Sequence, residues 1–290
     1  MPQLSKKLKL FILFISFIEG GAVMFTELVS AKLVAPYFGT SLYVWASVLG
    51  ITLGSLATGY FTGGYFSNKL KNNFLLYWVL LLAGCFVALM PFSSVWIMKQ
   101  TINMSIQSGV TISMLVFLFP PLVLFGMMSP IIINTLTTQA QESGKISGLV
   151  YSISTVGGIL FTYLTGFYIL PYYGISYPTV IFGSILFIIP FFILIAKNKF
   201  AAFAFLILMF IPFSKVKTIN KGKVPGFNVI YQNEGIFGQV KVLDHNYGTL
   251  SRGVKFGRGL MVNNTCQTIL DIQNPDYSLW DYAFFFPNAA

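Results

Sequence analysis

Residues 17–32 read FIEGGAVMFTELVSAK, and they lie within one of the most hydrophobic segments of the chain. The stretch nevertheless contains two carboxylates, Glu19 and Glu27, and it ends at Lys32. On insertion scales, a charged side chain at the centre of a bilayer costs roughly 2.5–3.5 kcal/mol. The two acids therefore need neighbouring helices that shelter them, and they are candidates for a site.

The composition is that of a membrane protein. Hydrophobic residues make up 56% of the chain and charged residues only 9%, whereas about a quarter of the residues in a soluble domain are charged. Residues 1–213 contain ten lysines and three acids, and residues 214–290 contain the other eight basic residues and five acids. We therefore expect a transmembrane helical bundle over 1–213 and a small water-exposed domain over 214–290.

The charges and cysteines exclude several classes of function. The net charge of +10 is what lysines flanking membrane spans produce, and no basic stripe with aromatic stacking positions indicates a nucleic-acid partner. Cys85 lies in a predicted span and Cys266 in the polar tail, so we expect no disulfide between them. With His245 as the one histidine and no cluster of thiols, we predict no metal site. No set of residues suggests catalysis by this chain, so we assign no catalytic residue.

Seven apolar segments are predicted as helices. Six of them are long enough to cross a hydrocarbon core, which needs about 20 residues. The seventh has 14 residues and contains a proline near its end, so it is predicted either to cross as a short or tilted helix or to be re-entrant. The segments are 10–34, 42–66, 74–98, 110–136, 147–170, 176–196 and 200–213.

The lysines predict the orientation of the spans. Eight lie at the N-terminus and in the loops on the same side, and only Lys99 lies in the opposite loops. By the positive-inside rule, the N-terminus is cytoplasmic. The sequence does not decide on which side of the membrane residues 214–290 lie. They are outside if 200–213 crosses and inside if it does not, and the basic residues within 215–223 favour the inside.

Two spans carry small residues at helical spacing, which lets helix backbones approach closely in lipid. We therefore predict tight packing at both. They are the middle helices of two three-helix halves, so an inverted repeat, an arrangement common in transporters, is the alternative interpretation. The residues are Ala46, Gly50, Gly54, Thr58 and Thr62, with Ser55, Gly59 and Gly63 beside them, and then Ser154, Gly158, Thr162 and Gly166.

The acids of the first span lie eight residues apart, about 80° around the helix and about 12 Å along it. Glu19 and Glu27 cannot share a proton, but both could face one interior groove. Each carboxyl either hydrogen-bonds to small polar residues such as Thr52 or Ser55 and stabilises the bundle, or forms a polar, proton-accepting site. Both alternatives stay open for Glu27, and the structural role is the prediction for Glu19. Lys32 reaches the far interface.

Four stretches of the spans carry recognisable motifs: FTELVSAKLVAPYFGTSLYVWASVLG at 25–50, LATGYFTGGYFSNKL at 56–70, FGMMSPIIIN at 125–134 and SGLVYSISTVGGILFTYLTGFYILPYYG at 147–174. They resemble the membrane portion of bacterial spermidine-synthase-like proteins, which are polyamine aminopropyltransferases fused to a multi-span domain. The resemblance implies a multi-pass protein of the bacterial inner membrane. Positions typical of the family are occupied by Glu27, Lys32 in place of a frequent arginine, Pro36, Gly39, Tyr151, Ser154, Thr155 and Gly157.

The tail alternates apolar and polar residues, with turn sequences at 246–248 and 257–259. This pattern predicts antiparallel strands near 227–232, 237–244, 252–256 and 259–263. It also resembles the small β-domain that opens an aminopropyltransferase.

The resemblance implies that Gln239 lies toward the thioadenosine part of the aminopropyl donor and that Gln267 lies near the amine acceptor. A following tyrosine corresponds to Tyr277 or Tyr282. Two departures stand out: the Ser and Tyr that precede the first glutamine are changed, and the Asp-Gly turn before the second is lost. The alternative for both glutamines is an ordinary strand residue in a small sheet.

In that family a Rossmann-like domain with a glycine-rich loop and a catalytic aspartate follows the β-domain, and no such loop follows a strand in residues 1–290. We therefore expect a membrane and β-domain portion that is not catalytically complete alone and that is either truncated or works with a Rossmann-like partner. Decarboxylated S-adenosylmethionine would be the co-substrate of the complete enzyme, and we expect no cofactor in this chain. The alternatives are a transporter-like protein that moves a small cation or polyamine and a purely structural anchor. A homo-oligomer is compatible with each.

Overall fold

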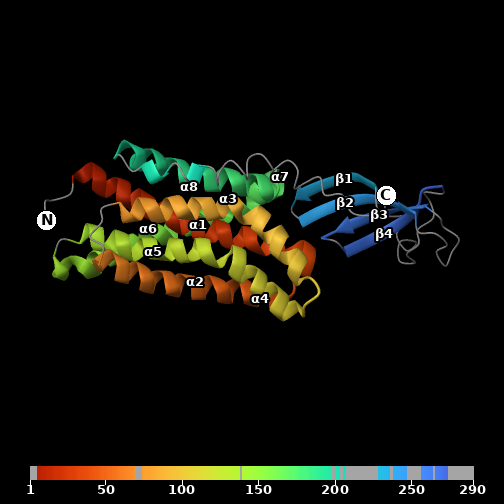
Figure 1. Cartoon of the computed structure of the whole chain (residues 1–290), viewed down its shortest axis with the longest axis horizontal. Coiled ribbons are helices and arrows are strands. Elements are labelled where there is room, and N and C mark those ends of the chain that lie inside the picture. The colour runs from red at the N-terminus through yellow and green to blue at the C-terminus, as the bar shows by residue number, and fades with distance from the viewer. Residues whose placement is uncertain are drawn as a thin grey trace.

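The computed structural model describes residues 5–69, 74–137, 139–197, 200–202, 205–206, 228–235, 238–246, 256–263 and 265–273. They form a bundle of helices followed by a small sheet (Figure 1). The helices are α1 (Lys6–Phe38), α2 (Leu42–Lys69), α3 (Leu75–Thr101), α4 (Ile106–Phe117), α5 (Phe119–Leu136), α6 (Ser143–Leu164), α7 (Leu170–Tyr173) and α8 (Ser176–Ala196). Shorter helical turns are η1 (Ala140–Glu142), the π-helical turn η2 (Thr165–Ile169) and η3 (Phe200–Ala202).

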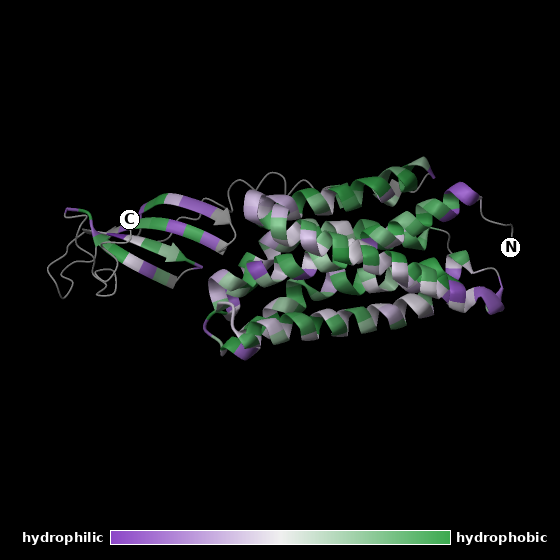
Figure 2. Cartoon of the chain, turned by 180° about the vertical axis from the view of Figure 1, so that it is seen from behind, coloured by the Kyte–Doolittle hydropathy of each residue, from purple (hydrophilic) through white to green (hydrophobic). Residues whose placement is uncertain are grey.

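Six helical segments of the described chain are long and apolar enough to cross a membrane, as predicted. The longest helix, α1, has 33 residues and is therefore about 50 Å long, compared with about 30 Å for a hydrocarbon core. Hydrophobic residues cover most of the bundle, and hydrophilic residues gather toward its two ends (Figure 2). Most of the predicted seventh segment lies outside the described residues.

The fourth predicted segment is two helices rather than one. Helices α4 and α5 meet at Leu118, and Pro120 and Pro121 follow in the first turn of α5. Proline lacks the N–H that would bond one turn back, so it is favoured in the first turn of a helix, where that N–H has no partner. The fifth predicted segment extends beyond its expected end, because η2 and α7 continue it to Tyr173.

Three helix pairs make the most extensive contacts in the described bundle: α1 with α6, α2 with α5, and α3 with α8. A glycine allows close approach in each pair, because a Cβ added there would meet the backbone of the partner helix. The predicted tight packing is confirmed for one row of the second span, with Gly59 and Gly63, and for part of the fifth span, whereas Gly50, Gly54 and Gly166 have open space beside them. The glycines are Gly20 and Gly157 for the first pair, Gly59 and Gly126 for the second, and Gly84 and Gly183 for the third.

This pairing has the symmetry of an inverted repeat. When the first three spans are exchanged for the last three, the pair α1–α6 becomes α5–α2, and α3–α8 maps onto itself. The two middle spans, α2 and α6, bury the smallest share of their side chains. A local sequence match agrees with this, because Pro91 follows Gly84 by seven residues in α3, and Pro190 follows Gly183 by seven residues in α8.

The sheet has four antiparallel strands in the order β1-β2-β3-β4. Its class, a small antiparallel sheet at the C-terminal side of the bundle, was predicted, and β1 and β2 were located closely, whereas the boundaries of β3 and β4 were not. The strands are β1 (Asn228–Gly235), β2 (Gly238–Asn246), β3 (Phe256–Val262) and β4 (Thr265–Asp271).

The predicted turn at 257–259 is wrong. These residues lie inside β3, where Arg258 stands opposite Asp244 of β2, and its guanidinium donates to both carboxylate oxygens at 2.8 and 2.9 Å. Strand β4 was not predicted. The hairpin that creates it lies between Val262 and Thr265, and Asn263 has a positive φ of 50° there, as a two-residue hairpin loop requires.

The N-terminal helix end and the sheet lie at opposite ends of the bundle (Figure 1). Helix α8 ends at the N-terminal end, and β1 begins beyond the other end, where β1 contacts α7 and β2 contacts α1. The end of α8 and the sheet thus lie at opposite ends of the bundle, and most of the residues that connect them lie outside the described part of the chain. The side of the membrane on which the sheet lies stays a prediction.

Candidate functional site

The Glu19 carboxyl lies in the interior of the bundle and is only 2% exposed. The Ser154 hydroxyl of α6 donates a hydrogen bond to its Oε2 at 2.9 Å, and the Ser129 hydroxyl of α5 lies 3.5 Å from both carboxyl oxygens. Three helices thus meet at one acidic group. Because α1 belongs to the first three-helix half and both α5 and α6 belong to the second, Glu19 lies at the interface between the halves.

The glycines beside Glu19 explain why the serines can reach it. A Cβ at Gly20 would overlap the backbone carbonyl of Ser154, and a Cβ at Gly157 would overlap that of Phe17. The absence of side chains at these two positions brings α1 and α6 into contact, so the short Ser154 side chain suffices to bridge them. Two positions of the family-like motif in the fifth span, Ser154 and Gly157, therefore serve the same contact.

Two tyrosines on the least buried spans bear on the surroundings of the acidic group. Tyr60 of α2 interacts electrostatically with Glu19 and with Tyr151 of α6. Both tyrosines are partly exposed, at 41% and 46%. Tyr60 is thus a partly exposed hydroxyl within electrostatic range of the buried carboxyl.

The Glu27 carboxyl has a different environment. It is half-buried and lies beside Thr52 of α2, whose buried hydroxyl makes no hydrogen bond within the described residues. The two acids therefore have different partners, and the single groove considered for both stays a prediction. A site role was left open for Glu27, and only a structural role was predicted for Glu19. In the structure, however, Glu19 has the more complete set of polar neighbours.

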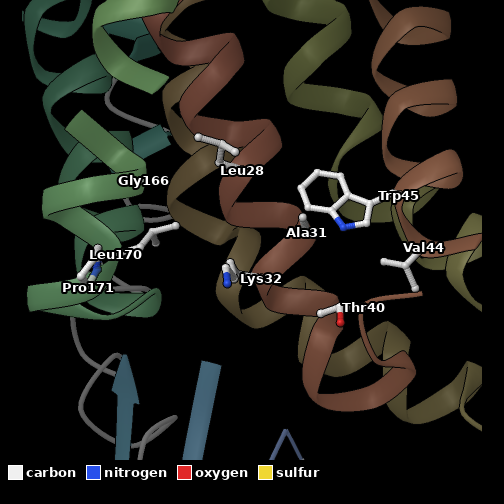
Figure 3. A pocket seen from close by; sticks show the side chains of 9 residues that line it. All are labelled: Leu28, Ala31, Lys32, Thr40, Val44, Trp45, Gly166, Leu170 and Pro171. Carbon is white, nitrogen blue, oxygen red and sulfur yellow. The ribbon is translucent and has the colours of Figure 1, made fainter. Parts of the chain in front are cut away.

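Lys32 lines a groove of about 120 Å³ at the end of the bundle that faces the sheet (Figure 3). The groove lies between α1, the start of α2, and the segment formed by η2 and α7. The indole of Trp45 points across it toward Ala31 (Figure 3). None of the lining residues is acidic; they are Leu28, Ala31, Lys32, Thr40, Val44, Trp45, Gly166, Leu170 and Pro171.

The two glutamines of the tail lie on β2 and β4, with β3 between them. The N–H of Gln239 donates to the Asn263 side-chain oxygen at 3.0 Å, and its carbonyl accepts from the Asn263 N–H at 2.9 Å. Gln267 is exposed at the β-bulge that follows the β3–β4 turn. Gln239 is thus near the β1–β2 turn, and Gln267 is near the β3–β4 turn. Strand β1 runs toward the bundle, so the β1–β2 turn lies at the edge of the sheet that faces the bundle (Figure 1).

Two further predicted residues, Tyr277 and Tyr282, lie outside the described residues. Other polar residues were not singled out from the sequence, namely Ser129, Tyr60 and the groove residues Thr40 and Trp45. Ser129 had a weak signal as a small polar residue in an otherwise apolar motif, and Trp45 had one as an aromatic residue near a span end.

Comparison with known families, with curated proteins and with solved structures gives no match to this chain. A functional proposal for this chain must therefore be argued from the groups described above. They are a buried carboxyl with two serine hydroxyls, a groove with one lysine, and two glutamines on a small sheet.

Proposed function

We propose that the chain is the membrane and β-domain portion of a spermidine-synthase-like aminopropyltransferase. The observation that supports this most is the β3–β4 turn. The family has an Asp-Gly turn before its second glutamine, and here Asn263, with a φ of 50°, makes the turn in its place. A hairpin turn before Gln267 is thus present without the Asp-Gly sequence, which supports the proposal.

In the complete system, an aminopropyl group would pass from decarboxylated S-adenosylmethionine to a diamine. Gln239 would bind the thioadenosine part of the donor, and Gln267 would lie near the acceptor amine. Only a neutral amine is nucleophilic, so an acid of a Rossmann-like domain or subunit would remove its proton. The bundle would hold this assembly at the bacterial inner membrane.

The test uses membranes from cells that express the whole chain, supplied with decarboxylated S-adenosylmethionine and putrescine. Release of methylthioadenosine above that of control membranes is expected. Loss of one side-chain hydrogen bond to a substrate, in Gln239→Ala or Gln267→Ala, should lower kcat/KM by about 2- to 10-fold, whereas the matched surface variant Gln273→Ala should have no effect. Turnover by the purified chain alone would contradict the need for a partner domain, and absence of turnover in all membranes would contradict completion of the enzyme by a separate Rossmann-like subunit.

A second candidate is a transporter-like function for the bundle, with a small cation or polyamine as substrate. It is supported by the position of Glu19, because transporters with inverted repeats bind substrates and ions near the midplane between the repeats. A carboxylate with two hydroxyls suits an ammonium group or a proton.

This candidate predicts uptake of labelled putrescine by proteoliposomes that contain the whole chain. Uptake should fall at least tenfold in Glu19→Gln, which keeps the shape of the side chain but removes its charge. Ser152→Ala, an exposed change on α6, should leave it unchanged. If the wild-type chain gives no uptake above empty liposomes, the bundle serves as an anchor.

A further inference from the structure

Thr52 has a buried hydroxyl that its own helix does not use. The hydroxyls that follow it along α2, those of Ser55, Thr58 and Thr62, each donate to a backbone carbonyl one turn earlier. The Thr52 hydroxyl makes no hydrogen bond within the described residues, although this residue is only 3% exposed. A buried hydroxyl without a partner is costly, because it has lost its bonds to water. The Thr52 oxygen is therefore available to a ligand.

The group beside Thr52 is the carboxyl of Glu27. Thr26 and Thr165 are also buried threonines whose hydroxyls lack a hydrogen bond in the described part of the chain, but Thr52 is the one that lies beside an acid of another helix. Glu27 is half-buried, so part of this side chain is accessible from outside the bundle. Two oxygen-bearing side chains, one from α1 and one from α2, thus lie side by side, and no hydrogen bond joins them.

The ligand that suits these two groups carries a single positive charge. A carboxylate inside an apolar span is tolerated when its charge is balanced. A hydroxyl oxygen and a carboxylate both offer lone pairs, and hard cations take oxygen ligands. A divalent or transition-metal ion needs more ligating groups, and the described residues contain no group of three or more His, Cys, Asp or Glu side chains that could hold one. One carboxylate balances one charge, which indicates a monovalent ion.

We propose that Glu27 and Thr52 bind one Na⁺ between α1 and α2, with water completing its coordination on the accessible side. The ion satisfies the Thr52 oxygen and balances the Glu27 carboxylate at the same time, whereas water alone satisfies only the hydroxyl. The site is separate from Glu19, which lies about 12 Å away along α1 and interacts with serines of α5 and α6. It requires neither aminopropyl transfer nor transport by this chain.

Equilibrium binding of ²²Na⁺ to the purified whole chain in detergent micelles, followed by scintillation proximity, measures occupancy directly. Saturable binding that unlabelled NaCl displaces is expected. Glu27→Gln, which keeps the shape of the side chain but removes its charge, should abolish this binding, whereas Glu19→Gln should retain it. Absence of saturable binding to the unmodified chain would overturn the proposal. Loss of binding in Glu19→Gln but not in Glu27→Gln would also overturn it, because the ion would then lie at Glu19.

Three variants of α2 test the second ligand. In Thr52→Val, which keeps the shape but lacks the hydroxyl, half-maximal binding should need about tenfold more Na⁺, as expected for the loss of one contact to a charged group. Thr52→Ser keeps the hydroxyl and should bind like the unmodified chain. Thr58→Val is the matched control, because the hydroxyl that it removes is bonded within α2. Equal weakening in Thr52→Val and Thr58→Val would contradict coordination by Thr52.

Competition distinguishes a metal ion from an ammonium group. Methylammonium should displace ²²Na⁺ only at concentrations well above those at which NaCl does so. Displacement by both salts at the same concentration would contradict an Na⁺ site, because the two groups would then accept an ammonium ion equally well.

Discussion

Glu19 receives hydrogen bonds from two helices while almost no part of it is exposed. A buried polar group is costly unless it has partners, so Ser154 and Ser129 are what make the acid tolerable in the interior. The acid itself was identified from the sequence, because an ionisable residue in an apolar run is conspicuous. Its partners were not, because serine is common in helix interfaces and its direction depends on the rotation of α5 and α6.

Ser154→Ala removes the shorter of the hydrogen bonds to Glu19. Hydrogen bonds between membrane helices contribute about 0.6 kcal/mol on average and up to about 1.7 kcal/mol. We therefore expect this variant to lower the free energy of unfolding by an amount within that range. Unfolding in mixed micelles of increasing dodecyl sulfate content, followed by circular dichroism, measures it. Ser152→Ala, two residues earlier and exposed, is the matched control, and an equal loss in both variants would contradict the role of Ser154.

The Cys266 thiol in β4 is half-buried, and burial raises its pKa above the ordinary value, although a contact with the Thr268 carbonyl at 3.7 Å opposes this. The thiolate is the reactive form, so a raised pKa means less thiolate at pH 8 and slower alkylation. In the Cys85→Ser chain, iodoacetamide should react with Cys266 more slowly than with free cysteine at pH 8. The rate should keep rising beyond pH 9, and a plateau near pH 8.5 would be inconsistent with the burial of this thiol.

At the scale of elements, each main helix contact depends on a residue that has no side chain. Small residues at a spacing of four predicted close packing in α2, but they did not identify the partner. The structure shows that one row, with Gly59 and Gly63, packs against α5, whereas Gly50 and Gly54 have open space beside them. The sequence pattern is the same for both rows, and only the arrangement of neighbouring helices distinguishes them.

Gly20→Ala and Gly50→Ala make the same chemical change in opposite surroundings. At Gly20 the new methyl group overlaps the α6 backbone, so we expect a loss of about 1–3 kcal/mol, as is usual for overpacking. At Gly50 nothing lies within 4 Å, and alanine should be neutral or should stabilise the helix by up to about 1 kcal/mol. The same micelle titration measures both, and similar values for the two variants would show that α1 and α6 are not in tight contact.

The strands show where prediction from local pattern ends. Alternation of apolar and polar residues identified β1 and β2 closely. In β3 the two glycines were taken for a turn, because glycine favours turns when nothing else is known. In the sheet, Gly257 and Gly259 are buried residues of a strand whose register is fixed by its pairing with β2 and β4. Register depends on long-range pairing, so the true turn at Asn263 was not recognised.

At the scale of the whole molecule, the separation of the N-terminus and the sheet is the main result that the sequence left undecided. Hydropathy located six spans well, since each is a long apolar run. It could not determine whether the chain crosses again after Ala196, because a 14-residue apolar segment satisfies both alternatives. The contacts of β1 with α7 and of β2 with α1 place the sheet at the far end.

This arrangement predicts that residue 5 and residue 273 lie on opposite sides of the membrane. A green fluorescent protein fused before Ser5 should fluoresce in bacterial cells, and the same protein fused after Gln273 and exported in unfolded form should not. Alkaline phosphatase at the two positions should give the reverse pattern. Fluorescence at both positions would place the sheet in the cytoplasm and contradict the end-to-end arrangement.

The matching of Gly84 and Pro91 with Gly183 and Pro190 has an evolutionary consequence. If both halves descend from one three-helix ancestor, that ancestor had to insert into the bilayer in either direction, as two copies that faced each other head to tail. Such a protein needs a nearly neutral distribution of charge between its two loops. The present surplus of lysines at one end would then have arisen after the gene doubled, when each copy acquired a fixed direction and became free to diverge.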